Sequence, residues 1–165
     1  MSIRPFVPWP AAILRTPAAK VENVSAEIRG IWQDMVDTME AMPGVGLAAP
    51  QIGLGLALAV VDASAERGRA ILMANPEVVM ASDKMHRWAE GSPNLPGVEA
   101  EVVRPAEVTV SFVDHAGMRV RREFEGLWAR SVQHQIDHLA GRMYFDNLSR
   151  VKRQMLLKRA RKVAR

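Results

Sequence analysis

Apolar residues recur at steps of three and four in one segment near the start of the chain. The stripe consists of Ile28, Ile31, Trp32, Met35, Val36 and Met39. This spacing places the apolar side chains on one face of an amphipathic helix. Ser25 is a good N-cap for that helix, and Pro43 with Gly44 ends it. The preceding residues 1–24 are rich in proline and predict irregular structure.

Shorter runs of β-type residues follow this helix. They predict strands over 56–62, 70–75, 78–80, 107–113 and 118–124. The last two runs flank the turn residues 114–117, which indicates a β-hairpin. Residues 91–97 read GSPNLPG, and two prolines with two glycines in seven positions predict a loop.

Helical patterns return near the end of the chain. Val132, Ile136 and Leu139 form the stripe of a helix over about 127–140, closed by Gly141. Residues 150–165 are helix-compatible and have a partial apolar face. A helix, several strands and two more helices predict an α+β fold with a mostly antiparallel sheet.

Composition limits the class of protein. The 165 residues predict one domain over 1–165, and 48% hydrophobic with 24% charged residues is a globular balance. The chain has no cysteine, which excludes disulfides, thiolate nucleophiles and cysteine-bound metals. No apolar run is long enough to span a membrane, and the first residues lack a signal-peptide pattern, so we expect a cytoplasmic protein.

The net charge of +4 is distributed unevenly. Residues 150–165 hold eight Lys or Arg residues and no acid, so the rest of the chain has a net charge of −4. This basic segment is either a surface for a partner or a solvated helical face.

Residues 134–138 read His-Gln-Ile-Asp-His. His134 and His138 are four residues apart, so both rings lie on one helix face and can reach one metal ion. Gln135 follows the first histidine, where a metalloprotease motif has a glutamate base, and an amide cannot accept that proton. Two polar histidines without a metal are the alternative. We expect Asp137 to pair with an arginine beneath the helix, Arg104.

Two further segments carry candidate chemistry. Residues 44–51, Gly-Val-Gly-Leu-Ala-Ala-Pro-Gln, bring backbone close to a ligand or simply form a tight connection into a core strand. Residues 90–96 carry the Ser92 hydroxyl, which serves as a nucleophile only beside a histidine base; a surface turn is the alternative.

Together the three segments resemble the signature motifs of the peptide deformylase family. GVGLAAPQ resembles GxGLAAxQ, EGSPNLPG stands where the family has EGCLS, and HQIDHLAG stands where it has HExDH. Order and spacing match over nearly the whole chain. The resemblance implies a peptide deformylase-like α+β fold, with mostly antiparallel sheets around a central helix that carries the HQxDH residues. It also implies removal of the formyl group from N-formylmethionine on nascent peptides during translation.

The resemblance also implies roles for individual residues. His134, His138 and position 92 would hold a divalent metal, Fe2+, Zn2+ or Ni2+. Position 135 would be the catalytic base, and Gln51 with the backbone N–H of position 93 would hold the oxyanion. The implied substrate-binding residues are Gly44, Gly46, Leu47, Gln51, Glu90 and Gly91.

The chain departs from the family at four of its positions. Ser92 replaces the cysteine ligand, and a serine hydroxyl is a poor metal ligand unless it is deprotonated. Gln135 replaces the glutamate base. Pro93 has no N–H to donate to an oxyanion. Glu99 stands where the family tends to have an arginine near the substrate.

Three functions follow from these observations. The first is a deformylase-like protein that lacks the activity or has little of it, binds peptide N-termini, and contacts the ribosome through residues 150–165. The second is a hydrolase with a non-standard metal site at His134 and His138, completed by Ser92, Glu90 or water. The third is an interaction protein that keeps the fold and no ligand pocket.

Overall fold

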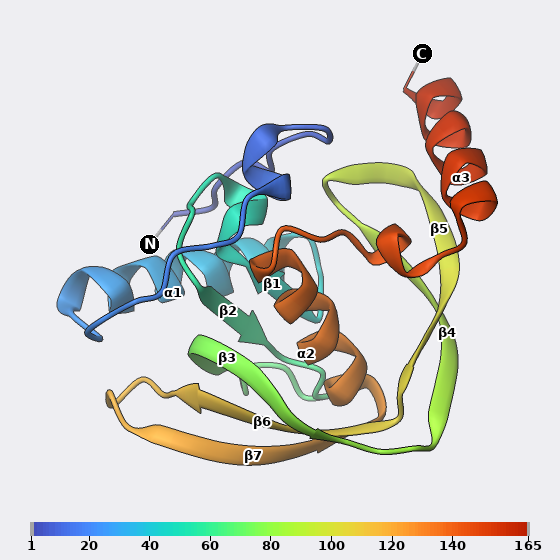
Figure 1. Cartoon of the computed structure of the whole chain (residues 1–165). Coiled ribbons are helices and arrows are strands. Elements are labelled where there is room, and N and C mark those ends of the chain that lie inside the picture. Colours follow the sequence, from blue (N-terminus) through green and yellow to red (C-terminus); the bar gives the residue numbers. More distant parts are fainter. Residues whose placement is uncertain (1, 165) are drawn as a thin grey trace.

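The computed structural model describes residues 2–164 and shows two antiparallel sheets with helices packed against them (Figure 1). The larger sheet has the strand order β1-β2-β3-β6-β7, and β4 with β5 forms the smaller one. The strands are β1 Gly46–Ala48, β2 Leu58–Val61, β3 Ile71–Ala81, β4 Met85–Ser92, β5 Leu95–Pro105, β6 Glu107–Val113 and β7 Arg119–Glu125.

Helix α1, Ala26–Ala41, confirms the predicted first helix. The Ser25 hydroxyl accepts a hydrogen bond from the Ile28 N–H at 3.3 Å, which satisfies one of the free N–H groups of the first turn. Trp32 and Met35 on its apolar stripe are fully buried against β1 and β2.

Helix α2, Gly126–Leu139, is the helix that carries the histidines, and it covers the opposite face of the sheet. The alternation of β2 explains this arrangement. Val60 packs in the cluster under α1, and the next residue, Val61, packs with Val132 of α2. The pocket described below forms where α2 meets the start of β1.

Two expectations about the strands are wrong. The runs 70–75 and 78–80 belong to one long strand, β3, because a register shift between Ala74 and Glu77 accommodates Pro76 without ending the pairing. Residues 91–97 are not a loop: β4 and β5 form a hairpin in which Ser92 pairs with Leu95. Pro93 occupies the turn itself, where no ladder N–H is needed.

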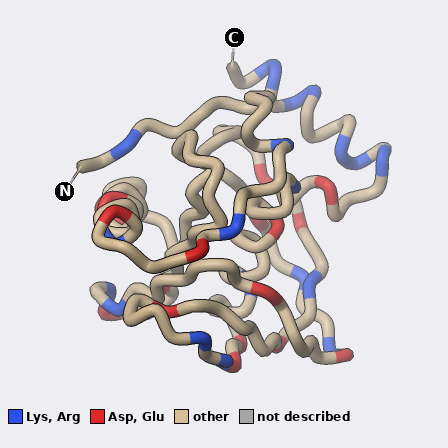
Figure 2. The backbone as a smooth tube through the Cα atoms, turned by 60° about the vertical axis from the view of Figure 1, so that its left-hand side comes forward, with Lys and Arg blue, Asp and Glu red and all other residues tan. Residues whose placement is uncertain are grey.

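Helix α3, Arg150–Val163, confirms the predicted helix at the C-terminal end. Leu156 and Ala160 are buried in a cluster with residues of β5 and of the 3-10 turn Tyr144–Asn147. Lys and Arg positions recur along this helix (Figure 2), and Lys152, Lys158, Arg159 and Lys162 are exposed. Within residues 2–164 no helix is long and apolar enough to cross a bilayer.

Candidate functional site

A cavity of about 400 Å³ lies between the start of β1, the hairpin turn of β4–β5 and one face of α2. It brings most of the site residues expected from the sequence into one place. These are Gly44, Gly46, Gln51, Glu90, Gly91, Ser92, His134 and Gln135, with Pro93. Leu47 lies outside this lining, because its side chain packs in the core under α1. His138 is buried beneath His134.

Helix α2 brings the Nε2 atoms of its two histidines close together. Their positions one turn apart put His134 Nε2 at 3.2 Å from His138 Nε2. The Nδ1 of His134 lies 2.8 Å from Glu90 Oε1, which fixes the ring and leaves Nε2 facing its neighbour. Burial lowers the pKa of His138 well below its ordinary value, so this ring is neutral.

Glu90 is the centre of a buried ionic cluster. Arg104 donates from Nε and Nη2 at 2.7 and 2.9 Å, and Arg130 adds a further ion pair. Burial raises the pKa of Glu90, but the bonds from Arg104 and His134 outweigh it and lower the pKa to about 2. Glu90 is therefore a charged support for His134.

Asp137 confirms the expected pairing beneath the helix. Its Oδ2 accepts a hydrogen bond from Arg104 Nη1 at 2.9 Å. Asn147 Nδ2 donates to the same oxygen at 3.1 Å. Arg104 thus joins the hairpin, through Glu90, to α2.

Around Gln51 and Ser92 the cavity wall consists of uncharged groups, and the buried Asn94 lies behind them. Asn94 Oδ1 accepts hydrogen bonds from Gln51 Nε2 at 2.8 Å and from the Ser92 hydroxyl at 3.1 Å. Asn94 Nδ2 donates to the carbonyls of Val7 and Gln51 at 2.7 and 3.0 Å. Asn94 therefore ties three segments together, and the hydrogens of Gln51 and Ser92 are directed at it.

Gln135 stands on α2 at the cavity, with 5% of its surface exposed. Its Oε1 is buried and has no hydrogen-bond partner within residues 2–164. A Cβ on Gly46 would collide with the Gln135 amide nitrogen and the Ser131 hydroxyl. Only glycine at position 46 lets β1 approach α2 this closely.

These residues do not fit a metal site with three protein ligands. The two imidazole nitrogens converge, but the third position holds the Ser92 hydroxyl, which bonds to Asn94. Serine is not among the groups that bind zinc or iron(II) readily. No group of three His, Cys, Asp or Glu side chains that suits a metal ion occurs among the described residues.

Sequence reasoning missed two residues of this site. Arg130 pairs with Glu90 and also donates to the His86 carbonyl at 2.8 Å. Asn94 lies in the segment for which the sequence predicts a loop, where asparagine is common. Both residues make contacts with residues at least 40 positions away, Asn94 with Gln51 and Arg130 with Glu90. Neither periodicity nor a motif indicates such contacts.

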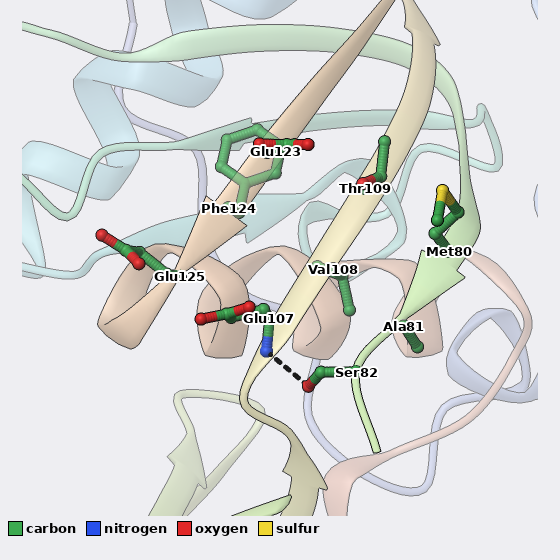
Figure 3. A pocket seen from close by; sticks show the side chains of 9 residues that line it. All are labelled: Met80, Ala81, Ser82, Glu107, Val108, Thr109, Glu123, Phe124 and Glu125. Atoms are coloured by element: carbon green, nitrogen blue, oxygen red, sulfur yellow. Dashed lines mark hydrogen bonds between the residues drawn. The ribbon is translucent and has the colours of Figure 1, made fainter. Parts of the chain in front are cut away.

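A second cavity, of about 510 Å³, lies at the ends of β3, β6 and β7 (Figure 3). Glu107, Glu123 and Glu125 line it, and the Glu107 N–H donates to the Ser82 hydroxyl at 3.1 Å. Its lining contains no histidine, lysine or arginine. None of the site residues expected from the sequence lies there, so the cavity beside α2 is the candidate active site.

Comparisons with known proteins agree with this geometry. Residues 3–154 match the family described as polypeptide deformylase. A peptide deformylase of Rhizobium meliloti is 40% identical over 167 residues, covering 100% of this chain and 96% of its own length. A protein named peptide deformylase-like, from Bradyrhizobium diazoefficiens, is 41% identical over 165 residues, with the same coverage.

Solved structures show the same similarity. The crystal structure of a peptide deformylase from Legionella pneumophila superposes with a TM-score of 0.92 at 37% identity, covering 99% of this chain and 96% of that one. A peptide deformylase from Ehrlichia chaffeensis in complex with actinonin gives 0.92 at 32% identity, covering 100% and 99%.

Proposed function

The chain belongs to the polypeptide deformylase family, whose enzymes are metal-dependent, and from that premise we propose that it binds peptide N-termini in the cytoplasm and deformylates them slowly or not at all. The proposal depends on one observation above the others. The Gln51 amide, which the family resemblance assigns to the oxyanion, is bonded to Asn94, at 2.8 Å, and to Ser92, at 3.4 Å. An oxyanion would have to displace both bonds.

The other catalytic positions support the same proposal. Gln135 cannot accept a proton as a carboxylate does, and loss of a general base reduces rates by roughly 10²–10⁴. Pro93 offers no N–H, and loss of one oxyanion donor costs about 10²–10³ in rate. The factors do not simply multiply, because residues of one catalytic unit act together.

The surroundings of the cavity favour a peptide as the ligand. Strand β1 is an edge of the five-stranded sheet, and its residue Gly46 lines the cavity. An extended peptide can add to such an edge through main-chain hydrogen bonds. Trp88 and Leu127 also line the cavity and are 58% and 46% exposed, so an apolar side chain would find contacts there.

The test compares turnover with binding. The purified protein, offered Fe2+, Ni2+ or Zn2+, is assayed for formate release from a formyl-methionyl peptide, beside an active family enzyme. We expect turnover at least a thousandfold below that enzyme, with peptide binding detectable by calorimetry. Turnover comparable to the active enzyme would contradict the proposal.

A slow metal-dependent hydrolase is the second candidate, favoured by the 3.2 Å approach of the two histidine nitrogens. Under this alternative the cavity cleaves a formyl or related amide with a weakly held metal. It predicts residual turnover that is abolished by His134→Ala and by a chelator. Turnover that survives either treatment would exclude it.

We also propose that the basic face of α3 binds rRNA on the ribosome. Lys152, Lys158, Arg159 and Lys162 are exposed along this helix. Deleting the helix is a poor test, because Leu156 is part of the core. A better test is the triple variant Lys152→Glu/Lys158→Glu/Lys162→Glu, which should fold normally and no longer pellet with ribosomes. The wild type should dissociate from ribosomes steeply as the salt concentration rises. Pelleting of the variant at the wild-type level would contradict this proposal.

A further inference from the structure

We infer that the cavity excludes cations, so that it keeps its shape without a metal ion and takes the uncharged end of a ligand. The inference concerns Gln135 and the charges around it. As far as it names a peptide as the ligand, it rests on the function proposed above.

The fixed charges at the cavity are already balanced. Glu90 and Arg130 are the charged lining residues other than the histidine, and they pair with each other. Behind them Arg104 pairs with Glu90 and with Asp137. Two carboxylates and two guanidinium groups therefore compensate one another, and an added cation would find two buried arginines and no free anion.

Glu90 also has no remaining capacity to accept a donor. Its Oε1 accepts from Arg104 Nη2 at 2.9 Å and lies 2.8 Å from His134 Nδ1. Its Oε2 accepts from Arg104 Nε at 2.7 Å and from Arg130. Two bonds to each oxygen fill the four lone-pair sites of a carboxylate.

The polar atoms that remain for a ligand are neutral. Gln51 and Ser92 are bonded to Asn94, and Gln135 offers a buried Oε1 without a partner. That oxygen can accept the N–H of an amide. A free α-ammonium in the same place would be desolvated beside a neutral amide, which is unfavourable without a paired anion. An acylated amino terminus avoids this penalty.

The first experiment uses two methionyl tripeptides that differ only at the amino terminus, one N-acetylated and one free. Binding is measured by calorimetry at pH 6.5, where the free amine is charged. We expect the acetylated peptide to bind the wild type at least tenfold more tightly. Gln135→Glu adds a carboxylate and should reduce that ratio at least tenfold, whereas the control Gln33→Glu, on the exposed side of α1, should leave it unchanged. Equal or tighter binding of the free amine by the wild type would overturn the inference.

A second experiment measures zinc and does not depend on peptides. After dialysis against equimolar Zn2+, elemental analysis should find the wild type empty, with the same melting temperature in zinc and in EDTA. The Ser92→Cys/Gln135→Glu variant supplies two anionic groups and should take up zinc, which shows that the assay detects it. Stoichiometric zinc in the wild type that is lost in His134→Ala would overturn the inference. If neither peptide binds, the proposed function fails and this zinc result alone decides the inference.

Discussion

The two walls of the cavity differ in the kind of interaction that builds them. Where the hairpin strands meet α2, Glu90, Arg104 and Asp137 form a largely buried ionic cluster that orients His134. At the hairpin turn, Asn94 accepts hydrogen bonds from Gln51 and Ser92 among uncharged groups. Ion pairs therefore hold His134 on one wall, while neutral amide and hydroxyl groups connect the other.

Breaking the charged wall should have the largest effect. Arg104→Met removes the partner of the buried Glu90 and of the part-buried Asp137, so we expect a loss of about 3–5 kcal/mol in the free energy of unfolding. Urea denaturation measures it. The control is Arg87→Met on the same hairpin, because the Arg87–Glu101 pair is 3.8 Å apart and exposed; about 0–1 kcal/mol is expected there. Equal losses in both variants would show that the buried cluster has no special role.

Breaking the neutral wall should have a smaller effect. Asn94→Ala leaves the Gln51 amide, the Ser92 hydroxyl and the Val7 carbonyl without their partner, and we expect a loss of about 2–3 kcal/mol. Asn23→Ala, at an exposed position, is the control and should stay within about 0.5 kcal/mol. A loss for Asn94→Ala larger than that for Arg104→Met would reverse the ranking of the two walls.

The ionic cluster around Asp146 lies outside the cavity and provides a third case for the comparison. Removing its charge should cause the smallest loss in the free energy of unfolding. Burial raises the pKa of Asp146, but bonds from Arg15, the Met143 N–H and Arg153 outweigh it and lower that pKa. The resulting stabilisation is complete above the unfolded pKa, near 3.8, and is lost as the pH falls below it.

The wild type should therefore exceed Asp146→Asn by about 1 kcal/mol at pH 6 and by less at pH 3, measured by urea denaturation at each pH. A difference that stays constant between the two pH values would show that the ionised form of Asp146 does not stabilise the fold.

The elements with a strong local signal were predicted well. The stripe with the Ser25 cap located α1, and the spacing of His134 and His138 located one face of α2. The pairing of Asp137 with Arg104 beneath the helix was predicted too.

The hairpin of β4 and β5 was not predicted, and its residues explain why. Its exposed positions include Trp88 and Val103, so the alternation of apolar and polar residues is weak. Pro93 sits in its turn, and Pro96 lies within β5, so local rules indicate a loop. The partners of Asn94 come from residues 7, 51 and 92. Only the assembled fold brings those segments together.

The junction between α3 and β5 determines how the cavity would face a bound surface. Gly97 lies on β5 just beyond the turn that holds Asn94, with φ +84°, and a Cβ there would collide with the Val163 side chain of α3. The basic helix is thus seated on the strand that leads out of the cavity wall. A surface that binds α3 would therefore also fix the orientation of the cavity opening. The distance from that surface to a bound peptide would be determined by the fold and not by a flexible linker.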